Sequence, residues 1–151
     1  MPTLENAVAD IPPVYGQFGQ TLAYAERTLT AVLTRHLAQR ATEPETWYAL
    51  RLTAASGPRI SRERLINELA GSPNLDPASA HELADRLEAQ GLLRGNDAVT
   101  LTAKGEALYR SLREFVLGAT TRLLDQFDQR DIETTVQTLQ AITARAAADS
   151  S

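Results

Sequence analysis

Three arginines lie close together in the middle of the chain, at Arg59, Arg62 and Arg64, and Glu63 is the one acid among them. Acidic residues are instead dense in residues 125–133, and the chain carries a net charge of −4. A local excess of positive charge in an acidic chain suits contact with phosphates at one place, rather than general coating of nucleic acid. An ordinary solvated surface is the alternative interpretation of this cluster.

A second group of residues combines arginine with aromatic rings. Trp47 and Arg51 are one helical turn apart, which allows a cation–π contact, and Tyr48 lies between them. An arginine beside aromatic rings suits an aromatic carboxylate. Core or interface packing with a polar handle is the alternative for such residues.

Catalytic machinery is sparse. The two histidines, His36 and His81, are far apart in the sequence, cysteine is absent, and no glycine-rich phosphate loop is present. Neither histidine has a second one at metal-ligand spacing. We therefore expect no enzyme activity, no cofactor and no metal.

The composition predicts one globular domain. The chain has 151 residues, of which 43% are apolar and 23% charged, as in ordinary soluble proteins. No apolar run approaches the roughly 18 residues of a membrane span, and no signal peptide is recognisable, so we expect a cytoplasmic protein. The lack of cysteine excludes disulfides and thiolate metal sites.

Hydrophobic spacing and capping residues predict four helices before any strand. The first covers residues 18–40, on an apolar stripe at spacings of three and four. Thr42 with Glu45 forms a capping-box pattern for the second. Ser61 is the expected N-cap of the third, and Asp76 followed by Pro77 that of the fourth.

A compact hairpin follows, with strands at residues 92–94 and 99–101 around a Gly-Asn-Asp turn. A long helix after Thr102 and a last helix capped by Asp131 complete the chain. The expected fold class is mainly α with a short β-hairpin.

Two helices joined by a tight connection and followed by a hairpin form the winged helix–turn–helix arrangement. Residues 43–125 hold this core and the long following helix, and residues 18–40 and 128–148 form helices whose unpaired apolar stripes predict dimerisation. Residues 1–17 are expected to be a flexible arm, the domain as a whole covers 18–148, and 149–151 form a tail.

The segment LADRLEAQGLL at residues 83–93, followed by LTAKG at 101–105, resembles the multiple-antibiotic-resistance regulator (MarR) family of bacterial winged-helix repressors. The resemblance covers most of the chain. It implies a homodimeric repressor of transcription, a pseudo-palindromic DNA operator, and release by a small aromatic or anionic ligand.

Carried over by position, the resemblance assigns the DNA contacts. The fourth helix would turn Leu83 and Leu87 to the core, and the start of the third helix would contact the DNA backbone. The residues expected at DNA are Arg59, Arg62, Arg64, Ser79, His81, Glu82, Arg86, Arg94 and Lys104.

The resemblance also implies a ligand pocket between the dimerisation helices and the winged core. The matching regions hold His36, Arg40, Trp47, Tyr48 and Arg51. For His36 on its apolar stripe, a role as an interface residue is the alternative.

One departure from the family concerns the wing. Members carry a longer hairpin with an Asp-x-Arg element, whereas here Gly95, Asn96, Asp97 and Ala98 join the strands without a basic residue at the tip. The sequence therefore leaves a second hypothesis open, a winged-helix dimer with weak or lost DNA binding that serves as a protein-interaction or small-molecule-binding module.

Overall fold

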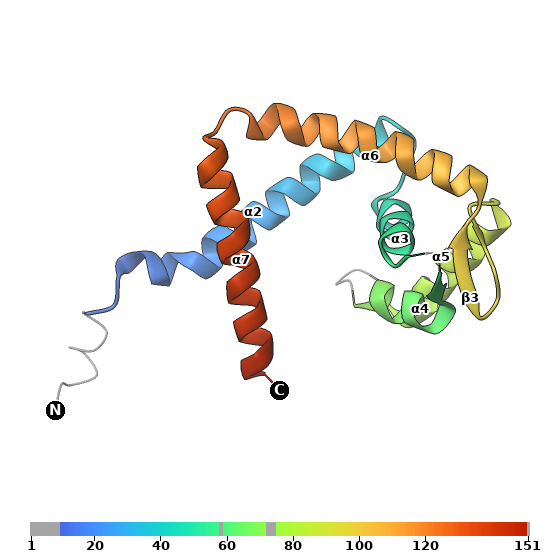
Figure 1. The fold of residues 1–151 in the computed structure, drawn as a ribbon, viewed down its shortest axis with the longest axis horizontal. Helices are drawn as coiled ribbons and strands as arrows, with labels where there is room; N and C mark the ends of the chain where they lie inside the picture. The colour runs from blue at the N-terminus through green and yellow to red at the C-terminus, as the bar shows by residue number, and fades with distance from the viewer. Residues whose placement is uncertain (1–9, 58, 72–74, 151) are drawn as a thin grey trace.

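The computed structural model describes residues 10–57, 59–71 and 75–150. Figure 1 shows a compact winged core beside a frame of long helices. Along the chain the elements are α2 (Pro13–Ala38), α3 (Pro44–Ala55), β1 (Ile60–Ser61), α4 (Arg62–Ala70), α5 (Pro77–Ala89), β2 (Leu93–Arg94), β3 (Ala98–Leu101), α6 (Ala103–Leu124) and α7 (Gln129–Asp149). The expected class, mainly helical with a small β-hairpin, is confirmed.

A small antiparallel sheet closes one side of the winged core. Its strand order is β1-β3-β2, with Ile60 opposite Val99 and Leu93 opposite Leu101. The sequence predicted the β2–β3 hairpin but missed β1. A strand of two residues is too short to show an alternating pattern.

The hydrophobic core lies between α3, α4, α5 and the sheet. Leu37, Leu50, Leu65, Leu87 and Val99 are its largest fully buried side chains. Leu83 of α5 is buried in the same cluster, so the predicted inner face of α5 is confirmed. This packing leaves the opposite face of α5 in solvent.

Side-chain caps fix where the core helices begin. The hydroxyl of Ser61 accepts a hydrogen bond from the backbone N–H of Arg64, and the carboxyl of Asp76 accepts one from Ser79. Both caps were predicted from the sequence. Thr102 caps α6 by accepting from the N–H of Gly105.

The capping box predicted at Thr42 is wrong. Helix α3 begins at Pro44 with Glu43 as an N-cap that makes no side-chain bond, and the Thr42 hydroxyl instead donates to the carbonyl of Arg40. Proline fixes the first helical residue and forces an extended conformation on the residue before it. The helix start therefore lies one residue after the predicted one.

Two other helix starts differ from the prediction. Helix α2 begins at Pro13, so residues 13–17 are helical rather than part of an arm, while residues 1–9 of that arm lie outside the described residues. Helix α7 begins at Gln129 with Asp128 as its cap, three residues before the predicted Asp131. In each case hydrophobic spacing showed the helix interior but not its first turn.

The glycine of the LTAKG segment, Gly105, is required for a steric reason. A Cβ atom on Gly105 would lie 2.1 Å from the carbonyl oxygen of Leu92. That carbonyl also accepts a hydrogen bond from the N–H of Thr102 at 3.1 Å. The first turn of α6 thus packs directly on the backbone that enters the hairpin, where only glycine fits.

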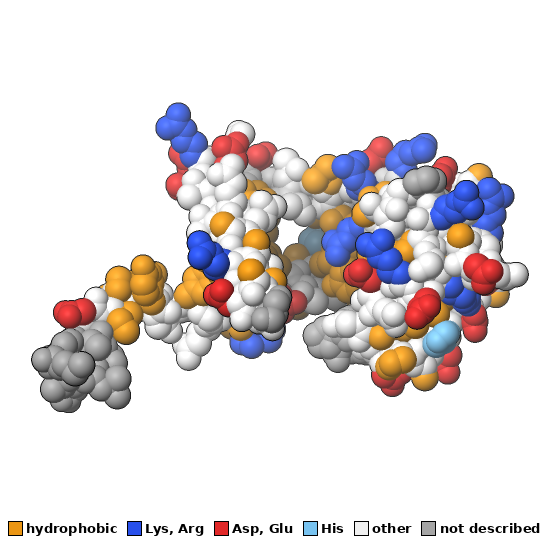
Figure 2. All heavy atoms as spheres, turned by 60° about the horizontal axis from the view of Figure 1, so that its bottom comes forward, with side chains coloured by type: hydrophobic (Ala, Val, Ile, Leu, Met, Phe, Trp, Pro, Cys, Tyr) orange, Lys and Arg blue, Asp and Glu red, His pale blue; other side chains and the backbone are white. Residues whose placement is uncertain are grey.

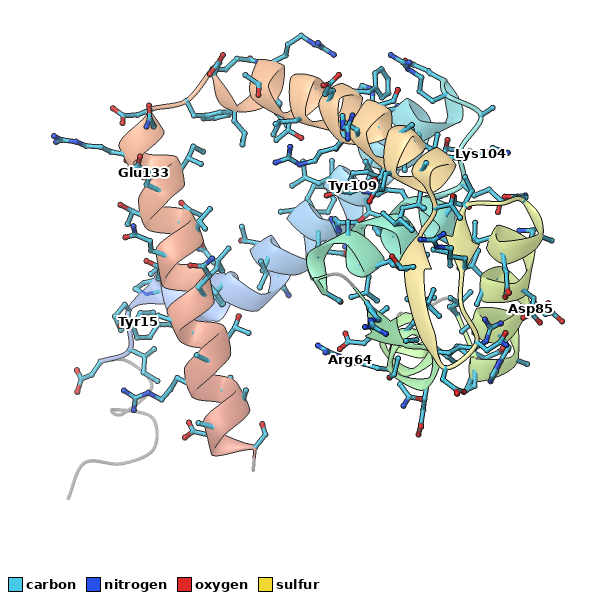
Figure 3. The ribbon with its side chains drawn as sticks, turned by 45° about the vertical axis from the view of Figure 1, so that its right-hand side comes forward. Tyr15, Arg64, Asp85, Lys104, Tyr109 and Glu133 are labelled. Carbon is cyan, nitrogen blue, oxygen red and sulfur yellow. The ribbon has the colours of Figure 1, made fainter. Side chains whose placement is uncertain are left out.

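The frame of long helices consists of α2, α6 and α7, and it is packed very differently from the winged core. Helix α7 has no buried residue among those described, and Leu37 is the buried residue of α2. Figures 1 and 3 show α7 standing away from the winged core. Within the described ranges, no helix has the length and apolar character needed to cross a membrane.

Candidate nucleic-acid interface

Helix α5 presents a polar face to solvent beside the hairpin. His81, Glu82 and Arg86 are exposed, and Ser79 in the first turn is half-buried. The cap residue Asp76 accepts bonds from Ser79, and these bonds to its charged form hold the pKa of its carboxyl below the usual range. The sequence therefore placed these side chains correctly on one accessible helix.

Arg62 is engaged within the protein. Its guanidinium forms ion pairs with Asp85 and with Glu88, the latter at 3.1 Å, and both carboxylates belong to α5. The sequence predicted Arg62 as a phosphate contact. The structure instead directs it across the α4–α5 packing interface.

The other arginines near α4 are more accessible. Arg64 is exposed and lies 3.7 Å from Glu68, one turn along the same helix, and Arg59 is exposed just before β1. Figure 3 shows Arg64 on the outside of the winged core, with Asp85 on α5 and Lys104 at the start of α6. An exposed pair at this spacing is weak, so Arg64 can exchange its partner for a phosphate.

The basic residues around the hairpin also have internal contacts. Arg86 pairs with Glu43 of the α3 N-cap at 3.3 Å, and the Lys104 ammonium donates to the carbonyl of Gln90 at 2.9 Å. Arg94 is exposed on β2. Arg86 was predicted as a phosphate contact, and its pairing with another element could not be seen from local sequence.

The charges of the segment that holds this interface nearly cancel. Residues 59–104 contain six lysines and arginines and seven aspartates and glutamates. Figure 2 shows the two signs interspersed over the winged core, not gathered in one band. Electrostatic attraction to DNA would thus depend on a few exposed cations rather than on a broad positive surface.

The hairpin tip is as short as the sequence predicts. The turn between β2 and β3 is made by residues 95–97, and Gly95 adopts a φ of +108° that favours glycine. The carbonyl of Asp97 accepts a hydrogen bond from the backbone N–H of Arg62 at 3.0 Å. This bond ties the tip to α4, so the hairpin does not project as a long wing.

The contacts of the aromatic and basic residues of α3 agree only in part with the prediction. The guanidinium of Arg51 lies 5.9 Å from the Trp47 ring centroid and 5.4 Å from that of Tyr48, which confirms the predicted cation–π contact. Trp47 also stacks on Tyr109 of α6 at 5.8 Å. Its buried indole N–H has no acceptor among the described residues.

The five residues expected at a ligand do not form one pocket. Tyr48 and Arg51 line a hollow of about 640 Å³, and Glu26, Glu45 and Glu68 line the same hollow. Arg40 lines a different hollow, of about 380 Å³. The guanidinium carbon of Arg40 lies 4.4 Å from the ring centroid of Phe115 in α6, and the ring centroid of His36 lies 6.1 Å from the same point.

Sequence reasoning missed the acidic partners of this interface, Glu43, Asp85 and Glu88. Arg62 and Asp85 are 23 positions apart, and Arg86 and Glu43 are 43 apart. Local spacing cannot reveal such pairs. A helix–turn–helix arrangement does bring the start of α4 near α5, which is the one available signal. Among the described residues, no group of acidic or histidine side chains could hold a metal ion.

Comparison with solved structures is informative about the fold. A MarR family protein from Bacillus stearothermophilus superposes with a TM-score of 0.70 at 20% identity, covering 97% of this chain and 99% of that one. The transcriptional regulator PA3341 gives 0.72 at 22% identity, covering 86% and 98%. The chain has the MarR-like winged-helix fold.

The same MarR-like fold is found in CouR from Rhodococcus jostii RHA1, solved with p-coumaroyl-CoA bound. It superposes with a TM-score of 0.67 at 20% identity and covers 83% of this chain and 90% of that one. No family model matches the sequence, and no curated protein matches it. The resemblance drawn from residues 83–105 therefore agrees with these structures in fold.

Proposed function

We propose that this protein is a DNA-binding transcriptional regulator that reads a pseudo-palindromic operator as a homodimer. The observation that carries the proposal is the exposed polar face of α5. The helix buries Leu83 and Leu87 and leaves His81, Glu82 and Arg86 in solvent beside the hairpin. In winged-helix proteins this is the helix offered to the major groove.

The proposed dimer uses the frame of long helices. Apolar side chains are exposed on α2, α6 and α7 together, where a single chain leaves them in water. They are Val14, Tyr15, Phe18, Leu22, Tyr24, Leu29, Leu117, Leu123, Leu124, Val136 and Ile142. A second copy would cover this surface and set two copies of α5 in the two-fold arrangement that a palindrome requires.

The proposed control is by a small aromatic ligand in the hollow lined by Tyr48 and Arg51. Arg51 offers the hollow a cation, and Tyr48 offers a ring. Glu26, Glu45 and Glu68 surround the same space, so a singly charged or neutral aromatic ligand suits it better than a multiply charged anion. The p-coumaroyl-CoA bound to CouR carries an aromatic ring and several phosphate charges, so it supports an aromatic ligand in this fold but not the low charge proposed for this hollow. We propose repression, relieved by the ligand, as the sign of regulation.

A competition titration tests DNA binding. The purified protein is mixed with the duplex upstream of its own coding sequence, in the presence of unrelated duplex, and the salt concentration is varied. Specific binding with a steep fall of affinity in salt supports the proposal. Retention of the operator should be weaker in His81→Ala and unchanged in Gln90→Ala, which alters an exposed residue at the other end of α5.

A second candidate function is supported by the balanced charges and the short hairpin. A winged-helix dimer with this face could bind another protein rather than DNA. Absence of binding to either duplex, even at about 50 mM salt, would favour it over the regulator.

A further inference from the structure

We propose that Arg62 of α4 holds Asp85 and Glu88 of α5 in two ion pairs and is not a phosphate contact. These two ion pairs are called the clasp below. Arg62 offsets one of the two negative charges that Asp85 and Glu88 place on α5, and this lets the helix approach the DNA backbone. The inference rests on the DNA-binding function proposed above. It assigns Arg62 a positioning and electrostatic role opposite to the one that its place in a cluster of arginines predicts.

The contacts of Arg62 distinguish it from its neighbour Arg64. One guanidinium nitrogen of Arg62 pairs with Asp85 and another with Glu88. Its side chain is 23% exposed, whereas that of Arg64 is 63% exposed and meets a single carboxylate at 3.7 Å. The planar fork of arginine suits two carboxylates three residues apart on one helix.

The backbone of Arg62 is held as firmly as its side chain. Its N–H donates to the carbonyl of Asp97 at the hairpin tip, and the preceding residue, Ser61, pairs with Ala98 in the sheet. To reach a phosphate, the guanidinium would have to leave both carboxylates. That exchange gains one ionic contact and gives up two.

Loss of the clasp would leave more uncompensated negative charge on α5. The Asp85 side chain is 71% exposed and that of Glu88 is 40% exposed, even while both are paired. Without Arg62, the net charge of this group would change from −1 to −2, on a helix that already carries Glu82. At physiological salt the Debye length is about 8 Å, so carboxylates on α5 act on phosphates that the helix approaches.

The test is a thermodynamic cycle on the full-length protein. Four proteins are compared, namely wild type, Arg62→Gln, Asp85→Asn with Glu88→Gln, and the triple variant. Each is titrated against a duplex of about 30 base pairs from the upstream region. We expect Arg62→Gln to weaken binding about tenfold when the carboxylates are present, and less than about twofold when they are amides.

Arg64→Gln is the matched control. It removes an arginine from the same turn of α4, but its effect should be equal in the two backgrounds because Arg64 does not contact Asp85 or Glu88 in the structure. The slope of log affinity against log salt should fall by about one unit in both, as for a lost phosphate contact.

Several results would overturn the clasp. If Arg62→Gln lowered the salt slope by about one in both backgrounds, as expected for Arg64→Gln, Arg62 would be a phosphate contact. An unchanged affinity in Arg62→Gln would show that the carboxylates do not matter. Thermal melts distinguish the proposed role from a role in folding. If affinity falls in both backgrounds in proportion to the fall in melting temperature, Arg62 acts through stability and the proposal is wrong.

The design also separates this inference from the proposed function. If Arg62→Gln fails to fold, the double and triple variants still decide, because both lack the carboxylates that Arg62→Gln alone would leave unpaired between α4 and α5. If wild type binds no duplex at about 50 mM salt, the regulator itself is wrong and the clasp falls with it. If wild type binds and the cycle shows no coupling, the clasp alone is wrong.

Discussion

The winged core and the helical frame solve the burial of apolar side chains in opposite ways. In the core, side chains from α3, α4, α5 and the sheet cover one another, and Leu50, Leu65 and Leu87 are completely buried. In the frame, α7 buries nothing among the described residues and leaves Val136 and Ile142 in solvent. The core is complete within one chain, whereas the frame has the surface of an unfinished interface.

Helix α6 shows the difference within a single element. Its first half packs Gly105 and Leu112 into the core, while Leu117, Leu123 and Leu124 in its second half are exposed. Regular helical structure therefore says little about where stability comes from. Tertiary packing supports the first half, and the second half requires a partner under the proposed dimer.

The largest expected effect breaks the frame. Val136→Asp places a charge on the exposed apolar face of α7, and in a symmetric dimer the charge would be buried twice. We expect dimer dissociation to rise by at least roughly 100-fold, since an unpaired buried charge costs about 3 kcal/mol or more. Sedimentation velocity across a dilution series measures it.

Thr134→Asp, two residues away on another side of α7, is the control and should leave the dimer intact. A Val136→Asp protein that sediments as wild type would remove α7 from the interface and leave the apolar frame without a partner.

A smaller effect compares the two halves of α6. Gly105→Ala should destabilise the core by about 3 kcal/mol, because the new methyl group meets the Leu92 carbonyl. Gly118→Ala meets only the end of the Arg122 side chain, at 3.7 Å, and should be neutral or stabilise by up to about 1 kcal/mol. Urea denaturation gives both values. Equal effects of the two substitutions would contradict the contrast between the halves.

The smallest effect concerns the cap of α5. The folded state lowers the pKa of Asp76, so its contribution is present above the unfolded pKa and disappears as the pH falls through the folded one. Asp76→Asn keeps a capping oxygen without the charge. We expect its melting temperature to match wild type at acidic pH and to be slightly lower at neutral pH. A constant difference from wild type at all pH values would show that the charge of Asp76 does not contribute.

The sequence predicted the helices and the hairpin well where side chains act locally. Ser61 and Asp76 as caps, Leu83 and Leu87 as core, and the Trp47–Arg51 contact are all matters of residues within one turn of each other. It failed at the Thr42 capping box, where a proline fixed the helix start, and at β1, where two residues make a strand only because β3 lies beside them.

The candidate interface was predicted by position but not by contact. The sequence identified an accessible helix with His81, Glu82 and Arg86, and the structure presents all three to solvent. It did not reveal that Arg62 and Arg86 are paired with carboxylates of other elements. The five expected ligand residues do not share one hollow of the chain, because His36 and Arg40, near the end of α2, pack on Phe115 of α6, whereas Tyr48 and Arg51 of α3 line another hollow.

By itself, the sequence determined the order of the helices, the inner face of α5, the short hairpin and the absence of cysteine chemistry, because these depend on residue type and local spacing. The tertiary structure decided which charges are free. Ion pairing depends on distances across packed elements, such as the start of α4 against α5, and residues far apart in the chain meet there only after the core has formed.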